Sequence, residues 1–122
     1  MHGYCSGAPG IGMLCNGMDI QGTEKITALA AAAVDGRPLL FRDHLCCGNS
    51  AIVEYYLTTG RRDEAGRVLS GIRDRKMRAG SYRLMASGYK DIPIPTLLSG
   101  YSGIGYEMLR YAYTDKIYPV FG

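Results

Sequence analysis

Three cysteines carry most of the chemistry that this sequence of 122 residues could perform. Cys46 and Cys47 are adjacent, and Cys5 lies near the N-terminus. A disulfide between Cys46 and Cys47 would be strained, because consecutive Cα atoms lie about 3.8 Å apart, below the usual disulfide range. The N-terminus also lacks the pattern of an export signal, so we expect a reducing, cytoplasmic location. In that compartment, grouped cysteines more often bind a metal or catalyse a reaction than form disulfides.

Composition narrows the class of protein. Charged residues make up 20% of the chain and apolar residues 47%, with a net charge of +3 and a pI of about 8.7. This balance is typical of a soluble globular protein and lacks the charge excess of a nucleic-acid-binding one. The longest near-continuous apolar run, residues 28–34, is far shorter than the roughly 20 residues of a membrane-spanning helix. We expect one domain, or part of one, with neither a nucleic-acid partner nor a membrane span.

Three short blocks of the sequence superimpose without gaps, and two of them contain the cysteines. The blocks are 5-CSGAPGIG-12, 46-CCGNSAIV-53 and 98-LSGYSGIG-105. Their shared residues are glycine at the third position (Gly7, Gly48, Gly100) and isoleucine at the seventh (Ile11, Ile52, Ile104). The separation of the blocks suits one helical hairpin per repeat, as in stacked or closed helical arrays.

The segments between the blocks have helical periodicity. Apolar residues from Ile26 to Val34 precede the stop signals Gly36 and Pro38, and a second run occupies residues 65–72; both predict outer helices. The segments that follow the glycine turns, about 12–14, 51–58 and 104–113, predict inner helices. The fold class is therefore all-α, with about three helical hairpins. The second outer helix also carries cations that we expect on a solvated face, or holding a peptide: Arg67, Arg73, Arg75, Lys76 and Arg78.

The repeat register gives the cysteines equivalent places. Cys5 and Cys46 both occupy the first position of a block, and Cys47 occupies the second. If the turns converge, three thiols meet, which suits a tetrahedral zinc ion with one coordination position left open for water or substrate. Backbone amides at Asn49 and Ser50, at the start of a helix, are predicted to favour the thiolate form.

Several residues have a plainer alternative. The three cysteines could be small buried hydrophobes, although their matching positions favour zinc. Cys15 lies off the repeat register and is expected in the core. His44 could be a fourth ligand, a donor to a ligand or a proton shuttle, but a loop histidine with satisfied hydrogen bonds is favoured. Packing roles, with hydroxyls that reach polar partners, are expected for Tyr55, Tyr56, Tyr101, Tyr106, Tyr111 and Tyr113.

The runs YCSGAPGIG, HLCCGN and LLSGYSGIGYEMLRYA together resemble the C-terminal part of the LanC-like cyclase domain of class II lanthipeptide synthetases. The likeness is to the subgroup with a Cys-Cys-Gly zinc motif, and it covers about residues 4–121. It implies that residues 1–122 are a C-terminal fragment of that domain and form part of an α/α toroid. It also implies that the zinc ligands are Cys5, Cys46 and Cys47.

The resemblance implies a zinc-dependent cyclase of bacterial lantibiotic biosynthesis. A cysteine of a ribosomally made precursor peptide would bind at the open zinc position, lose its proton and add to a dehydrated Ser or Thr, forming a lanthionine or methyllanthionine ring. The family's acid/base histidine and its aspartate partner lie upstream of the YCSG motif. The catalytic residues therefore stay unassigned, with His44 as a candidate, and we expect this chain to keep the zinc-binding half without being a competent cyclase.

Two other classes of function fit the same residues. One is a non-catalytic LanC-like protein that binds zinc and a thiol or peptide. The other is a redox or thiol-buffering protein that uses Cys46 and Cys47. In each case an unfinished helical array should expose apolar edges, so we expect self-association through them.

Overall fold

The computed structural model describes residues 3–18, 21–84 and 94–120, and every regular element within these ranges is an α-helix. This confirms the all-α prediction. None of the helices described is long and apolar enough to cross a membrane. The five helices are α1 (Ala8–Gly17), α2 (Glu24–Val34), α3 (Asn49–Thr58), α4 (Arg62–Ala79) and α5 (Tyr101–Ala112).

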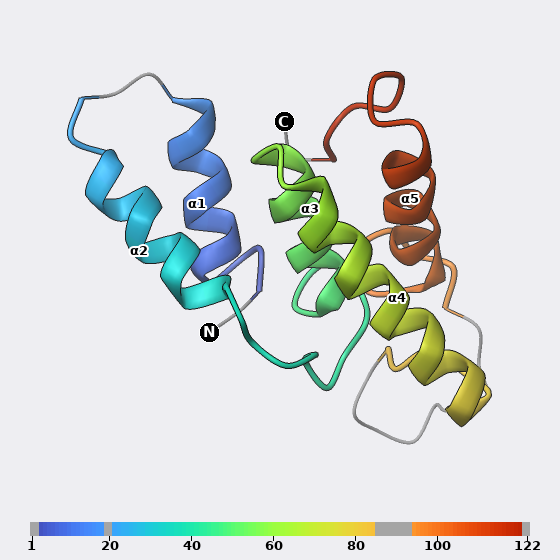
Figure 1. Ribbon diagram of the computed structural model, residues 1–122. Coiled ribbons are helices and arrows are strands. Elements are labelled where there is room, and N and C mark those ends of the chain that lie inside the picture. The colour runs from blue at the N-terminus through green and yellow to red at the C-terminus, as the bar shows by residue number, and fades with distance from the viewer. Residues whose placement is uncertain (1–2, 19–20, 85–93, 121–122) are drawn as a thin grey trace.

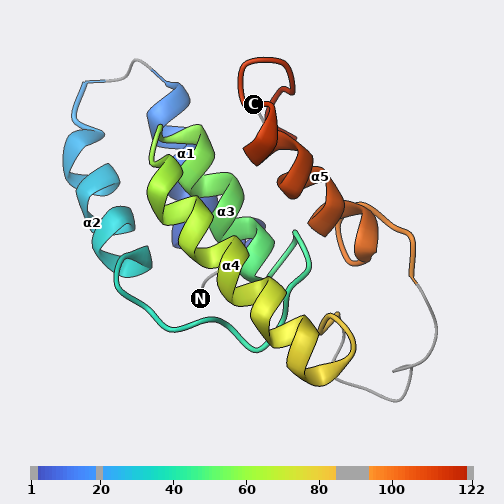
Figure 2. The same cartoon turned by 45° about the vertical axis from the view of Figure 1, so that its right-hand side comes forward.

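The helices form two layers. Helices α1, α3 and α5 make an inner row in which α3 contacts both neighbours, while α2 packs on α1 and α4 on α3 as hairpins. The inner helices run in the same direction and the outer helices return (Figures 1 and 2). Each glycine turn therefore lies at the same end of the inner row. Among the described residues the third block has an inner helix, α5, but no outer helix of its own.

Helix α1 is longer than predicted, because its glycines serve close packing and do not end the helix. The helix begins behind Gly7, with a proline in its first turn, where the missing N–H has no helical partner in any case. Gly12 lies against α3 and α2: a Cβ there would meet the ring of Tyr55 at 2.6 Å and the Cβ of Ala30 at 3.1 Å. A glycine-rich inner helix thus lets its neighbours approach.

The outer helix α4 has charges that match its dipole. Asp63 and Glu64 lie in its first turn, and Lys76 and Arg78 in its last, each near the partial charge of opposite sign. Its end is set by Gly80, which has φ +81° and donates its N–H to the carbonyl of Lys76 at 2.8 Å. This left-handed residue is a common helix terminator.

The core centres on α3, because that helix is covered from three sides. Every residue from Asn49 to Leu57 is buried. Apolar side chains from the other four helices pack around α3, namely Met13, Val34, Ala65, Leu69, Ile72 and Ile104. Helix α3 therefore fixes the place of the Cys46–Cys47 turn that precedes it.

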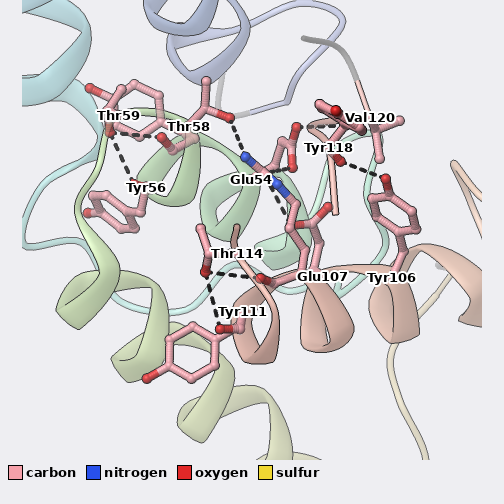
Figure 3. Close-up of polar contacts among 12 residues, drawn as sticks. Glu54, Tyr56, Thr58, Thr59, Tyr106, Glu107, Tyr111, Thr114, Tyr118 and Val120 are labelled. Atoms are coloured by element: carbon pink, nitrogen blue, oxygen red, sulfur yellow. Dashed lines mark hydrogen bonds and ion pairs between the residues drawn. The ribbon is translucent and has the colours of Figure 1, made fainter. Parts of the chain in front are cut away.

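Charged residues also lie inside the fold. Glu54 of α3 and Arg110 of α5 form an ion pair, and the two residues are 0% and 3% exposed. Arg110 also donates to the Thr58 hydroxyl at 3.1 Å, and Glu54 accepts the N–H of Val120 at 3.1 Å. This polar group joins α3, α5 and the segment after α5 (Figure 3).

The tyrosines confirm the expected packing and polar contacts only in part, because Tyr113 is 55% exposed. Tyr55 and Tyr56 are buried. The Tyr56 hydroxyl donates to Asp35 at 3.3 Å, and the Tyr106 hydroxyl donates to the carbonyl of Tyr118 at 2.6 Å.

Candidate metal centre

The structure brings the sulfur atoms of Cys5, Cys46 and Cys47 together. The Sγ of Cys5 lies 3.3 Å from that of Cys46 and 3.5 Å from that of Cys47, and the last two lie 3.4 Å apart. Within the described ranges, this is the one group of three or more His, Cys, Asp or Glu residues whose ligand atoms all lie within 4.8 Å of one another. Cys5 is exposed and the other two are half-buried, so the cluster faces solvent on one side.

Backbone hydrogen bonds join the three glycine turns. The N–H of Tyr4 donates to the carbonyl of Cys46 at 2.8 Å, and the N–H of Cys46 donates to the carbonyl of Leu98 at 2.8 Å. The first turn also approaches the second closely, since a Cβ on Gly3 would lie 2.9 Å from the Sγ of Cys47. The turns therefore converge as the repeat register predicts, although residues 5 and 46 are far apart in the chain.

The loop before α3, residues 40–48, curls over the start of that helix. The N–H of Asn49 donates to the carbonyl of Arg42 at 2.9 Å, and the N–H of Ser50 donates to that of Asp43 at 3.2 Å. These are the two amides that were expected to stabilise the thiolates. The expectation was wrong, because loop carbonyls already accept from both amides. The helix N-terminus thus holds the loop in place.

The side chains at the start of α3 strengthen this arrangement. The Asn49 amide group donates to the carbonyls of Leu40 and Arg42 and to the Asp43 carboxylate, at 2.9–3.1 Å, and its oxygen accepts the N–H of Leu40 at 2.7 Å. The Ser50 hydroxyl donates to the carbonyl of Asp43 at 2.6 Å. The loop that leads to the two adjacent cysteines is therefore fixed at several points.

Arg75 departs from the predicted solvated face. Arg67, Arg73 and Arg78 are exposed as expected, but the Arg75 side chain is only 13% exposed. It forms an ion pair with Asp43 and donates from its other terminal nitrogen to the carbonyl of Leu40 at 2.7 Å. The charge pattern does not indicate this role, because Arg75 is one of several cations that lie close together in the sequence.

The thiols influence one another electrostatically. Hydrogen bonds from Cys46 and then from Cys47 lower the pKa of the Cys5 thiol. Burial, followed by the hydrogen bonds with Cys5 and Cys47, raises the pKa of Cys46 to about 12. Of these two thiols Cys5 is therefore the more easily ionised, whereas three thiolates at these separations need a cation beside them.

The cluster fits zinc in the chemistry and spacing of its donors. Thiolates about 2.3 Å from a tetrahedral zinc lie about 3.8 Å apart, so the observed separations need to open by only a few tenths of an ångström. Thiolate sulfur is a soft ligand that suits zinc. Three protein donors leave one position of the tetrahedron for another ligand, and the exposed side of Cys5 is where such a ligand could approach.

The other two candidate residues lie outside the thiol cluster. His44 is 4% exposed, and its Nδ1 accepts the N–H of Cys47 at 3.3 Å. Burial and the charge of Arg42 lower its pKa. His44 thus comes closest to the loop-histidine alternative, since it braces the turn through the backbone, although its Nε2 has no hydrogen-bond partner among the described residues. Cys15 is half-buried on α1.

Two residues whose supporting role the sequence pattern does not indicate help to hold the site in place. They are Asp43 and Arg75, which are separated by 32 residues. The one local signal is the polar pair Asn49-Ser50 directly after the Cys-Cys-Gly run, which is a composition that favours hydrogen bonds with nearby backbone.

Comparison with known proteins identifies a family. The family model described as lanthionine synthetase C-like protein matches residues 3–121, a range that includes all three glycine turns. No curated protein matches the chain. No solved structure matches it either.

Proposed function

Because the chain belongs to the lanthionine synthetase C-like family, we propose that it is the zinc-binding part of a cyclase that forms lanthionine and methyllanthionine rings. The three converging sulfurs of Cys5, Cys46 and Cys47 are the observation that carries this proposal. The Cys-Cys-Gly run further suggests a class II synthetase. The partner would be a ribosomally made precursor peptide that contains dehydrated Ser and Thr, and the reaction would take place in the bacterial cytoplasm.

The residues of this chain would hold the metal and leave room for the substrate. Zinc, when bound, would lower the pKa of a peptide thiol and keep it nucleophilic. The peptide sulfur would add to the β-carbon of a dehydroalanine or dehydrobutyrine. A C–S bond forms, the C=C π bond breaks, and the α-carbon takes up a proton. No residue in the described ranges is assigned as the donor of that proton.

Metal titration tests the binding step. The purified, reduced chain should bind one Co²⁺ or Zn²⁺ and show the absorption of thiolate–cobalt coordination. Cys46→Ala should abolish tight binding, whereas Cys15→Ala should keep it, because Cys15 lies outside the cluster. Addition of a cysteine-containing peptide should then change the cobalt spectrum. A spectrum that ignores added thiols would indicate a closed structural site, and absence of metal binding would favour a redox role.

A non-catalytic binding protein is the second candidate. It is favoured by His44, the one histidine described, which is buried and braces a turn, so it is poorly placed as an acid/base group. Ring formation can be followed by alkylation, because cyclisation consumes free peptide thiols without changing mass. Zinc-dependent loss of alkylatable thiols from a dehydrated precursor peptide would identify a cyclase. Peptide binding without that loss would identify a binding protein.

A further inference from the structure

The carboxylate of Asp43 lies at the centre of a polar network in the loop that leads to the two adjacent cysteines. Asp43 is 1% exposed. It accepts hydrogen bonds from the side chains of Asn49 and Arg75 and from the N–H of Arg83, the last at 2.9 Å. Its own N–H donates to the carbonyl of Arg83 at 2.7 Å. Three separate parts of the chain thus meet at one side chain, three residues before Cys46.

Arg75 brings the outer layer into this network. It lies on α4, a helix that contributes none of the thiols, and it reaches the loop at both Leu40 and Asp43. A guanidinium can hold two acceptors in a fixed geometry, which a lysine ammonium cannot reproduce. The loop is therefore held against α4 at two points, and α3 holds it from the other side through Asn49.

We propose that Arg75 and Asp43 are a positioning pair that fixes the turn of Cys46 and Cys47 against Cys5, so that outer helix α4 controls how tightly the thiols hold a metal. The inference rests on the proposed metal-binding function. Its physical basis is preorganisation: a turn that is already fixed loses less conformational freedom when its sulfurs bind an ion. Groups that hydrogen-bond directly to metal ligands typically change metal affinity by about 10–100-fold when they are altered, and a pair that acts through the backbone of the turn is expected at the lower end of that range.

Conservative variants test the pair. Arg75→Lys keeps the positive charge but not the two-point contact, and Asp43→Asn keeps the shape but not the charge. Each should lower zinc affinity by about tenfold or more, measured by competition with a chromophoric chelator. Arg73→Lys is the matched control, since Arg73 lies on the same helix but is exposed and, within the described part of the chain, pairs with its neighbour Asp74 and not with the loop. It should leave the affinity unchanged.

A second measurement separates positioning from general stability. Affinities are compared at a temperature where circular dichroism shows each metal-free variant to be as helical as the wild type, and the cobalt spectrum should shift in Arg75→Lys but not in Arg73→Lys. Wild-type zinc affinity in the folded Arg75→Lys and Asp43→Asn variants would overturn this inference but leave the proposed metal-binding function intact. Unfolding of both metal-free variants would also overturn the inference, by making the pair a requirement of the whole fold. Failure of the wild-type chain to bind metal would instead refute the proposed function.

Discussion

At the scale of single residues, Glu107 is a group whose ionisation opposes the fold. It is fully buried on α5, and neither of its carboxyl oxygens has a hydrogen-bond partner among the described residues. Burial, and then the negative charge of Glu54, raises its pKa to about 9. Between the ordinary pKa of a glutamate and that value, the folded chain keeps a proton that the unfolded chain releases. Stability should therefore fall as pH rises through this window.

Glu107→Gln should remove that contribution. The variant keeps the shape of the protonated acid but has no proton to lose. The wild type should therefore lose unfolding free energy relative to the variant as the pH rises from about 5 towards 9. The slope can approach about 1.4 kcal/mol per pH unit for one group. Urea unfolding of both metal-free proteins across this range measures the difference, and parallel curves would contradict the expected role of Glu107.

The sequence predicted the thiol cluster well and its supports poorly. Cys5 and Cys46 share a register position, so the repeat predicts that they meet if the turns converge. Asp43 and Arg75 share no register, and their contact depends on where α4 packs over the loop. Glu107 likewise looks like an exposed helical charge until its neighbours are placed. Contacts between residues that share no repeat register are therefore the part that local pattern does not reveal.

At the scale of the elements, the glycines before α3 and α5 let these helices begin close beneath a loop. Gly48 has extended backbone angles that any residue can adopt, so its importance is one of space. A Cβ there would lie 2.6 Å from the carbonyl oxygen of His44 and 2.7 Å from that of Arg42. These are backbone atoms, so the loop itself would have to move.

Gly48→Ala should therefore destabilise the chain by about 1–3 kcal/mol, as overpacking does, and weaken zinc binding because the cysteine turn shifts. Gly105→Ala is the matched control. Among the described residues, its added methyl group would meet no atom within 4 Å beyond its chain neighbours and the nearby backbone of its own helix. This helical position should therefore gain slightly in stability, by about 0.4–1 kcal/mol. Thermal unfolding and chelator competition on both variants provide the comparison. Equal behaviour of the two would show that the loop above Gly48 yields easily.

The helices themselves were the most predictable part, because strong periodicity marks α2 and α4 in the sequence. The start of α1 was not predicted, because its glycines and proline are typical of a turn when they are considered alone. The decisive factor is the contact of Gly12 with Tyr55 and Ala30, which becomes visible only when the hairpins are packed together.

At the scale of the whole molecule, the row of hairpins has an open side. The seventh block residue is buried in the second and third repeats, where Ile52 and Ile104 are 9% and 1% exposed, but Ile11 is 52% exposed. Leu14 and Met18 continue this stripe along α1, at 62% and 44% exposed. A surface that is internal in the other repeats is therefore uncovered here, which favours association.

We accordingly propose that the isolated chain self-associates through this α1 stripe. Sedimentation equilibrium should show concentration-dependent oligomers, and Leu14→Glu should weaken them by about tenfold or more, equivalent to about 1.4 kcal/mol. Met77→Glu is the control, since Met77 is 72% exposed on α4, away from the stripe. A monomer at all concentrations would contradict the proposal, as would equal effects of the two variants.

The separation of the thiol-bearing turns has a consequence for the unfolded chain. An ion held jointly by Cys5 and Cys46 would act as a cross-link across 41 residues of sequence, a loop that contains both helices of the first hairpin. By the chain-entropy estimate used for disulfides, closing such a loop removes freedom from the unfolded ensemble worth about 4 kcal/mol. The metal would then be a reversible cross-link around the first hairpin. Its release would restore to that segment the conformational entropy of a chain without the cross-link.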